Sequence, residues 1–356
     1  MKKFIVSVIL FLIVTSGIVY FKSGKEILTL LDEKKVYSIE NIQTTMLENL
    51  DRYDFFNDGV VTYNNQKIQF RDYNGNLIWE NQDKSFSQQV FVTDKYIFRN
   101  TENTIQVIDK SNQVFIIAEI NGSILNVSRE NGKTYMIIKN TDGGNSLYII
   151  NDKNEVIMDN KSFEDNITSV SISDKSESYA IITLSFDSGK IVNTVHLNLI
   201  DEVELWSFPV EDEILVKAEI VNNNVIAIGT NNVYYFNLNG KLLWKNGVYS
   251  KILDYEISKE TEKIYMMYSK DNAVELIAYN LEGKVSEINK VAGAAQKLKV
   301  YEGKVFVYNE SSIYLVHGTS TDKIYEDTKS TISDFTVEGN SIRILSKDKL
   351  ITGKLK

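Results

Sequence analysis

Short apolar segments, separated by clusters of Asn, Asp, Gly and Ser, recur along the chain from residue 27 to its end. In this part no long stretch repeats its apolar residues with the 3.6-residue period of an amphipathic helix. Short strands bounded by turn-forming residues are typical of an all-β protein. The segments 135–138, 179–183, 225–228, 264–268 and 305–308 are apolar at nearly every position, which predicts strands covered on both faces.

One hairpin recurs in the sequence. Residues 70–79 and residues 235–244 share a pattern in which an apolar strand ends at a polar residue, turns through Gly and reaches Trp four residues later. Residues 199–206 repeat this pattern without the glycine. Asn-Gly and Asp-Gly pairs supply residues that accept the positive φ of tight hairpin turns. The chain is therefore predicted to repeat one hairpin-containing unit.

The spacing of these turns gives the size of the unit. Turns fall near residues 75, 112, 154, 202, 240, 283 and 322, at intervals of about 41 residues on average. Four-stranded blades of a β-propeller have this period, and the chain after residue 26 holds about eight of them. A two-layer sandwich would instead show regular alternation of apolar and polar residues along its strands. The predicted fold is an eight-bladed β-propeller.

The last blade lacks one strand in its own segment. Strands are predicted at 331–337, 341–346 and 350–355, and the chain then stops. We expect the missing outer strand to come from the start of the domain, with residues 35–39 as the first choice and 27–31 as the alternative. Closing the ring in this way removes an otherwise exposed sheet edge.

The hairpins at 70–79 and 235–244 resemble the repeats of pyrroloquinoline-quinone-like and WD40-like β-propellers. The whole chain resembles membrane-anchored propeller proteins of unknown function from low-GC Gram-positive bacteria. The repeat departs from the quinoprotein pattern at Phe70 and Tyr235, where an alanine is usual. The resemblance implies a structural role, docking one blade on the next, for the three tryptophans of the chain: Trp79, Trp206 and Trp244.

An uncharged segment at 4–21 follows two lysines and is closed by further lysines. As a helix it would span roughly 27 Å, close to the hydrocarbon thickness of a bilayer. The alternative is a cleaved signal peptide, whose apolar region is usually only about 7 to 15 residues long. We expect a membrane anchor at 1–25, a tether at 26–34 and the propeller at 35–356. Lysines flank the helix on both sides, so the orientation is not decided by charge.

Composition excludes several kinds of chemistry. The 356 residues carry a formal net charge of −9, contain no cysteine and include only two histidines. An acidic chain has no basic field to attract nucleic acid. Without cysteine, the vicinal cysteine pair common in quinone-dependent dehydrogenases cannot form. We predict no cofactor, no metal ion and no nucleic-acid partner.

Two groups of carboxylates are candidates for a catalytic role. Glu202 and Glu204 are predicted on one face of an outer strand, far from a propeller channel, and residues 211–213 follow Pro209 in a loop that is typically solvated. His196 and His317 have no second histidine nearby and are predicted to be packed or surface residues. No catalytic residue is predicted.

Residues 151–155 alternate oxygen-bearing side chains and faintly resemble a calcium loop. They lack the glycine and the distal glutamate of an EF-hand and fall where a hairpin turn is expected. A turn is therefore predicted there.

These observations predict a non-enzymatic binding or scaffold protein, anchored in the cytoplasmic membrane as a single-pass protein with its propeller on the extracytoplasmic side. Its partner would be a protein or a cell-envelope polymer; the alternative is an envelope hydrolase or lyase that uses carboxylates at the channel mouth. The expected binding face is formed by loops between second and third strands and between blades. Its candidate residues are Asn64, Asn65, Glu102, Asp142, Asp165, Asp187, Glu211, Asp212, Asn231, Asp271 and Glu310.

Overall fold

A computed structural model describes residues 37–64, 66–82, 90–101, 103–248, 250–270, 273–291 and 294–356. The predicted membrane helix, the tether and the alternative closing strand at 27–31 lie outside the described residues. Among the described residues, no helix is long and apolar enough to cross a membrane.

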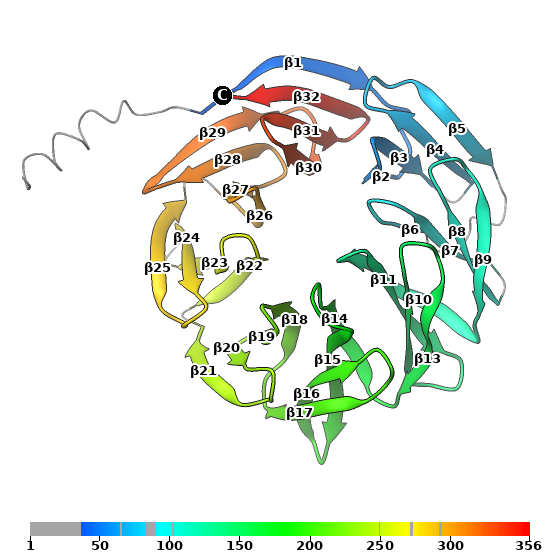
Figure 1. Cartoon of the computed structure of the whole chain (residues 1–356). Coiled ribbons are helices and arrows are strands. Elements are labelled where there is room, and N and C mark those ends of the chain that lie inside the picture. Colours follow the sequence, from blue (N-terminus) through cyan, green and yellow to red (C-terminus); the bar gives the residue numbers. More distant parts are fainter. Residues whose placement is uncertain are drawn as a thin grey trace, which may run out of the picture.

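The chain forms a ring of eight four-stranded antiparallel sheets around a central opening, with the first strand of each sheet innermost (Figure 1). This confirms the predicted eight-bladed propeller. Blades 1 to 4 follow one another along the sequence. Blade 1 consists of β2 (Arg52–Phe56), β3 (Gly59–Tyr63), β4 (Lys67–Asp72) and β5 (Leu77–Gln82); blade 2 of β6 (Val90–Val92), β7 (Ile97–Thr101), β8 (Thr104–Ile108) and β9 (Val114–Glu119); blade 3 of β10 (Gly122–Glu130), β11 (Lys133–Asn140), β12 (Asn145–Ile150) and β13 (Val156–Phe163); and blade 4 of β14 (Asn166–Ile172), β15 (Ser178–Asp187), β16 (Lys190–Leu199) and β17 (Glu204–Glu211).

Blades 5 to 7 continue the same order. Blade 5 consists of β18 (Leu215–Val221), β19 (Asn224–Gly229), β20 (Asn232–Phe236) and β21 (Leu242–Gly247); blade 6 of β22 (Lys251–Ser258), β23 (Lys263–Lys270), β24 (Ala273–Asn280) and β25 (Val285–Val291); and blade 7 of β26 (Lys297–Tyr301), β27 (Lys304–Tyr308), β28 (Ser312–His317) and β29 (Ser320–Glu326).

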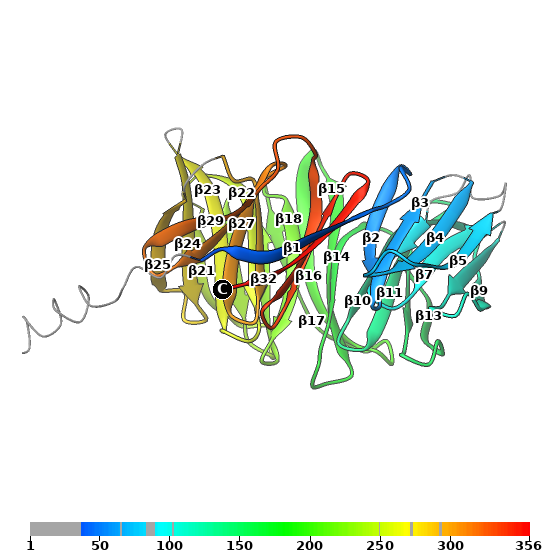
Figure 2. The ribbon, with the colours of Figure 1, turned by 90° about the horizontal axis from the view of Figure 1, so that it is seen from above.

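Blade 8 joins the two ends of the chain. It contains β30 (Ile332–Glu338), β31 (Ser341–Ser346) and β32 (Lys349–Leu355), and its outer strand is β1 (Ile39–Met46), antiparallel to β32. Figure 2 shows β1 running beside β32 across the rim of the ring. Closure by an N-terminal strand is confirmed.

The predicted position of that strand, 35–39, was wrong by several residues. The pairing begins with Ile39 opposite Leu355 and ends with Met46 opposite Lys349. Just beyond the strand, Leu47 is buried with Leu345 and Leu350, and its amide donates to the carbonyl of Asp348 at 2.7 Å. The burial of Leu47 beside Leu345 and Leu350 fixes where the strand ends. The closing strand therefore lies several residues later in the sequence than predicted.

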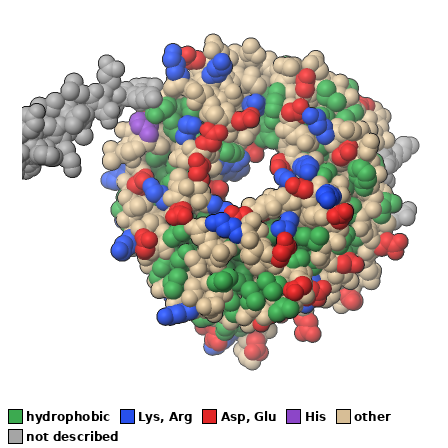
Figure 3. Space-filling model, in the orientation of Figure 1, with side chains coloured by type: hydrophobic (Ala, Val, Ile, Leu, Met, Phe, Trp, Pro, Cys, Tyr) green, Lys and Arg blue, Asp and Glu red, His purple; other side chains and the backbone are tan. Residues whose placement is uncertain are grey.

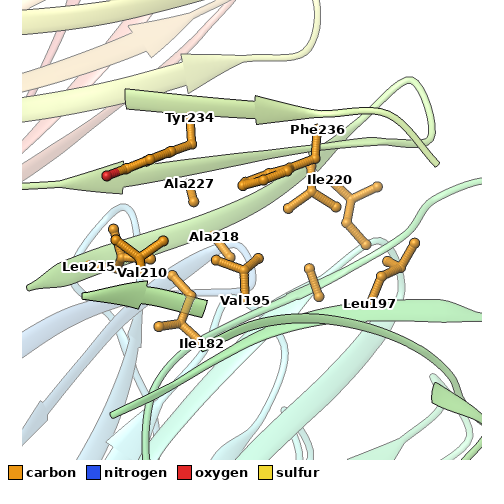
Figure 4. Close-up of a cluster of buried hydrophobic side chains, with 12 residues drawn as sticks. Ile182, Val195, Leu197, Val210, Leu215, Ala218, Ile220, Ala227, Tyr234 and Phe236 are labelled. Atoms are coloured by element: carbon orange, nitrogen blue, oxygen red, sulfur yellow. The ribbon is translucent and has the colours of Figure 1, made fainter. Parts of the chain in front are cut away.

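The second strands of the blades are covered on both faces, as predicted. Strands β11, β19 and β23 are buried at nearly every central position. Their side chains join apolar clusters that lie between successive blades. Figure 4 shows one such cluster, in which Val195 and Leu197 of blade 4 meet Ala218 and Phe236 of blade 5. Packing between neighbouring blades therefore forms the core.

Most of the predicted turns, which gave the repeat length of about 41 residues, are third-to-fourth-strand hairpin turns in the structure. At six of the seven predicted positions (75, 112, 154, 202, 240 and 283) the residue has a φ between +61° and +86°. The side chain that opens the turn also accepts backbone N–H groups; Asn237, for example, accepts from Asn239 at 3.0 Å and from Lys241 at 2.9 Å. The seventh turn was misplaced: the turn between β28 and β29 is at Gly318, and Asp322 lies within β29.

Candidate functional site

The ring has two different faces because successive strands of a blade run in opposite directions. We call the side that carries the second-to-third-strand loops and the blade-to-blade loops the interblade face. The opposite side, with the first-to-second-strand and third-to-fourth-strand turns, is called the turn face. Strand β1 starts beside Leu355 on the turn face and ends beside Lys349 on the interblade face. The N-terminal part of the chain therefore joins the ring from the turn face.

The described members of the predicted binding face all lie on the interblade face. Asn64 and Asp165 are half-buried there, and the others are exposed: Asp142, Asp187, Glu211, Asp212, Asn231 and Glu310. Asn65, Glu102 and Asp271 lie outside the described residues. The binding role of these residues remains a prediction.

Glu213 does not belong to a solvated loop, contrary to the expectation for residues 211–213. Its side chain is 5% exposed. Its carboxylate accepts the backbone N–H groups of Asn231 and Asn232, each at 2.7 Å, and the hydroxyl of Tyr234 at 2.6 Å. A buried carboxylate that accepts several hydrogen bonds from one loop stabilises the conformation of that loop. Glu213 thus holds the β19–β20 loop of the interblade face in place.

Three adjoining cavities open on the interblade face over blades 5 to 8. The first, of about 360 Å³, lies between blades 5 and 6, and the second, of about 630 Å³, lies between blades 6 and 7. A third, of about 200 Å³, lies between blades 7 and 8 and includes Glu310. Leu253 lines the first two, and Gln296 lines the second and third. Val, Ile, Leu and Ala residues line much of the first two cavities, whereas the lining of the third is mainly polar; the sequence alone could not place these residues together.

Charged side chains surround the central opening, as the space-filling view in Figure 3 shows. One network joins three blades. Lys259, just after β22, lies 2.5 Å from Glu130 at the end of β10 and 2.9 Å from Glu219 on β18. Lys217, also on β18, lies 2.9 Å from Glu219. Blade 6 is thereby tied to blades 3 and 5. Sequence reasoning missed this network, since its members are up to 129 positions apart.

The surroundings of Glu130, Glu219 and Glu256 shift the pKa values of these carboxyls in different directions. Burial, together with repulsion from Glu219, raises the pKa of Glu130 to about 7. Burial also opposes ionisation of Glu219, but the attraction of Lys217 and Lys259 and a hydrogen bond from Glu130 outweigh it, so the pKa of Glu219 is lowered. Burial, and again the charge of Glu219, raise the pKa of Glu256 on β22 to about 7. Glu130 and Glu256 therefore change charge near neutral pH.

These shifts predict that the propeller becomes less stable between pH 6 and pH 8. The folded protein binds protons on Glu130 and Glu256 more tightly than the unfolded chain does, so their contribution is present below the unfolded pKa and is lost as pH rises through about 7. We expect each to contribute on the order of 1–2 kcal/mol. Urea unfolding at pH 6 and pH 8 measures the change. Glu256→Gln should flatten the pH dependence, and an unchanged slope in this variant would contradict the assignment.

The three tryptophans link consecutive blades. The indole N–H of Trp79 donates to the carbonyl of Lys110 at 2.8 Å, that of Trp206 to Leu238 at 2.9 Å, and that of Trp244 to Leu281 at 2.8 Å. Each acceptor lies in the hairpin turn of the next blade.

Glycine in those turns makes room for the indole. A Cβ atom on Gly240 would come within 2.7 Å of Trp206, and one on Gly283 within 2.8 Å of Trp244. Both glycines also have a positive φ. The Gly and Trp of the sequence pattern therefore touch in consecutive blades.

The remaining candidates occupy ordinary structural positions. His196 lies 2.9 Å from Glu204 and 3.1 Å from Thr183, and His317 lies 2.8 Å from Asp322. Glu202 has a φ of +74° and lies in the turn before β17. It therefore does not share a strand with Glu204, contrary to the prediction.

Residues 151–155 form the predicted hairpin turn. The side-chain oxygen of Asn151 accepts the N–H groups of Lys153 at 2.9 Å and of Glu155 at 3.0 Å. Among the residues that the structure describes, no group of three or more His, Asp or Glu side chains could hold a metal ion.

The fold is similar to that of several solved structures. The computationally designed Ika8 protein matches with a TM-score of 0.60 and 14% identity, over 87% of this chain and 98% of Ika8. BamB from Moraxella catarrhalis matches with a TM-score of 0.56 and 12% identity, over 89% and 99%. Apo AztD from Citrobacter koseri matches with a TM-score of 0.50 and 10% identity, over 90% and 97%. At these identities the likeness shows the fold alone.

No curated protein matches the sequence. A family model described as "Family of unknown function (DUF5711)" matches residues 32–355, which include every described blade. The chain therefore belongs to the DUF5711 family.

Proposed function

We propose that the protein is a non-enzymatic binding platform, anchored in the cytoplasmic membrane by residues 4–21, that offers the interblade face of its propeller to a protein partner. One observation carries the proposal. Three adjoining cavities lie on this face; the first is largely apolar, with Val216, Ile252 and Leu253 in its wall, and the second combines apolar residues such as Val274 and Val291 with polar groups. Apolar recesses with a polar rim suit side chains of a protein better than the hydroxyl-rich surface of an envelope polysaccharide.

The path of the chain supports the proposed orientation. Strand β1 begins on the turn face, where Tyr37 donates its backbone N–H to Asp322 at 3.1 Å and its ring lies 5.0 Å from that of His317. A membrane anchor that precedes this point would hold the turn face toward the bilayer. The interblade face would then point away from the membrane, where a partner has access.

The binding face can be tested by photo-crosslinking in living cells. A photoreactive phenylalanine replaces Asn231 on the interblade face or Asn239 on the turn face; both positions are exposed and belong to blade 5. We expect a discrete crosslinked protein from position 231 and none from position 239. Crosslinking from position 239 alone would contradict the proposed face.

The orientation gives a separate prediction. The chain has no cysteine, so Asn231→Cys and Asn239→Cys each introduce a single thiol. On intact cells, a bulky membrane-impermeant maleimide should label Asn231→Cys much faster than Asn239→Cys, because the membrane shields the turn face. Equal labelling of both variants after detergent lysis is the control. The reverse order on intact cells would overturn the orientation, and no labelling of either would place the propeller inside the cytoplasm.

A hydrolase or lyase on the same scaffold is the second candidate, and the channel carboxyls favour it. Glu256 has a pKa of about 7, suitable for a general acid, while Glu219 is held ionised by Lys217. Against this, the oxygens of Glu130 and Glu219 are already engaged by lysines. If the enzyme hypothesis holds, Glu256→Gln should abolish turnover of an envelope substrate without weakening crosslinking from position 231.

A further inference from the structure

The first strands of five blades carry a β-bulge close to the interblade face. In each, one residue is skipped in the pairing with the second strand, within the first four residues of the strand. The skipped residues are Leu125, Thr168, Val216, Leu253 and Ser333. A bulge redirects the side chain of the extra residue and recurs near binding sites. The bulges belong to blades 3, 4, 5, 6 and 8, so they surround most of the channel mouth.

Three of the bulged residues are apolar; Leu125 and Val216 are exposed, and Leu253 is partly buried against the apolar cluster between blades 6 and 7. Leu125 is 47% exposed and Val216 is 39% exposed. Leu253 lines both of the larger cavities, and Val216 lines the first of them. Val216 and Leu253 line the first cavity together, and a contiguous apolar surface that solvent can reach favours a site that another surface covers. The bulges thus build an apolar collar, Leu125, Val216 and Leu253, at the mouth.

The interblade face beside this collar is strongly acidic over blades 3 to 5. Five carboxylates there, which we call the acidic arc, have no ion pair among the described residues: Asp142, Glu164, Asp165, Asp187 and Asp212. Lys190 is exposed nearby and is already paired with Glu211 at 2.9 Å. On the other side of the mouth, Lys251 and Lys297 begin β22 and β26. Glu310 is an exposed carboxylate on that side too, so negative charge is concentrated over blades 3 to 5 and is accompanied by lysines over blades 6 and 7.

We propose that the channel mouth on the interblade face binds a polypeptide segment that inserts an apolar side chain into the collar and places basic residues over the acidic arc. This inference rests on the proposed function and specifies the chemistry of the partner. The collar supplies the desolvated centre that dominates interface energies. The arc supplies charge complementarity, which speeds association and selects a basic segment over an acidic one.

The proposal can be tested with three fluorescent peptides of equal length and the full-length protein. One peptide alternates Lys and Leu, the second alternates Glu and Leu, and the third alternates Lys and Ser. We expect measurable anisotropy binding of the Lys-Leu peptide, with affinity at least roughly tenfold higher than for either of the others. Equal or tighter binding of the Glu-Leu peptide, or no binding of the Lys-Leu peptide, would overturn the proposal.

Two matched pairs of variants separate specific binding from general attraction to an acidic protein. Leu125→Ser/Val216→Ser removes two members of the collar, and Val203→Ser/Leu205→Ser removes one Val and one Leu of similar exposure near the opposite face. Only the collar variant should weaken Lys-Leu binding, by roughly tenfold. Equal weakening in both would contradict a site at the mouth.

The second pair tests the arc. Asp187→Asn/Asp212→Asn neutralises two of its carboxylates, and Asp174→Asn/Asp201→Asn neutralises two exposed carboxylates on the turn face. We expect roughly threefold weaker binding for the first variant only, and a smaller dependence on salt. Equal effects would overturn the role of the arc. If crosslinking from position 231 persists while no peptide discriminates, the proposed function stands and the chemistry assigned to its partner is wrong.

Discussion

Removing residues 1–46 should abolish cooperative folding of the propeller. The truncation deletes β1, so β32 keeps a free edge along Lys349–Leu355 and blade 8 no longer closes the ring. An unpaired edge also exposes a template for aggregation. We expect a loss of at least about 5 kcal/mol, comparable with the whole stability of many domains. Thermal unfolding followed by circular dichroism, together with gel filtration, measures the loss.

The control for this experiment is a chain that lacks only residues 1–36. It retains β1, Leu47 and the contact of Tyr37 with Asp322. We expect this shorter truncation to unfold in one cooperative transition and to remain monodisperse. Equal melting temperatures for the two truncated chains would show that β1 is not needed to close the ring.

Replacing Trp244 by Ala should destabilise the propeller by about 3 kcal/mol, near the lower end of the range for large aromatic residues. Its ring packs 5.4 Å from that of Tyr235 and against Gly283, and its N–H donates to Leu281 of the next blade. The side chain is only half-buried, which keeps the cost below that of a fully enclosed tryptophan. Chemical denaturation of the variant and the wild type gives the difference.

Trp244→Phe is the matched variant. It keeps much of the apolar contact and removes the N–H donor, so we expect a loss of about 1 kcal/mol. The structural role predicted for Trp244 requires that crosslinking from position 231 survives in both variants. Unchanged stability combined with lost crosslinking would instead make Trp244 part of a binding site.

The repeating part of the fold could be predicted because each blade repeats the same local chemistry. Turn residues such as Gly75 and Gly240 adopt the positive φ that their sequence favours, and the continuous apolar segments became doubly covered second strands. The closing strand was misplaced because Ile39–Met46 has few apolar residues, and its position depends on where Leu47 is buried. That requirement comes from tertiary packing and leaves no local pattern.

The candidate site was less predictable than the fold. Loop residues such as Asp187 and Asn231 could be assigned to one face from strand direction alone. The bulges that bring Val216 and Leu253 into one cavity depend on strand register, which no residue pattern in β18 or β22 reveals. The ion pairs of Lys259 join residues from three blades. Such contacts form only when the ring closes, so they cannot be predicted from the local sequence.

Hydrogen exchange of the full-length protein can show whether a partner covers the interblade face. Exchange is measured by mass spectrometry for the protein alone and for the complex captured by crosslinking from position 231. We expect slower exchange in the complex for the loops around 212–214, 229–232 and 250–253, with the turns at 237–241 and 280–284 unchanged. Protection of those turns, with the interblade loops unchanged, would contradict binding at this face.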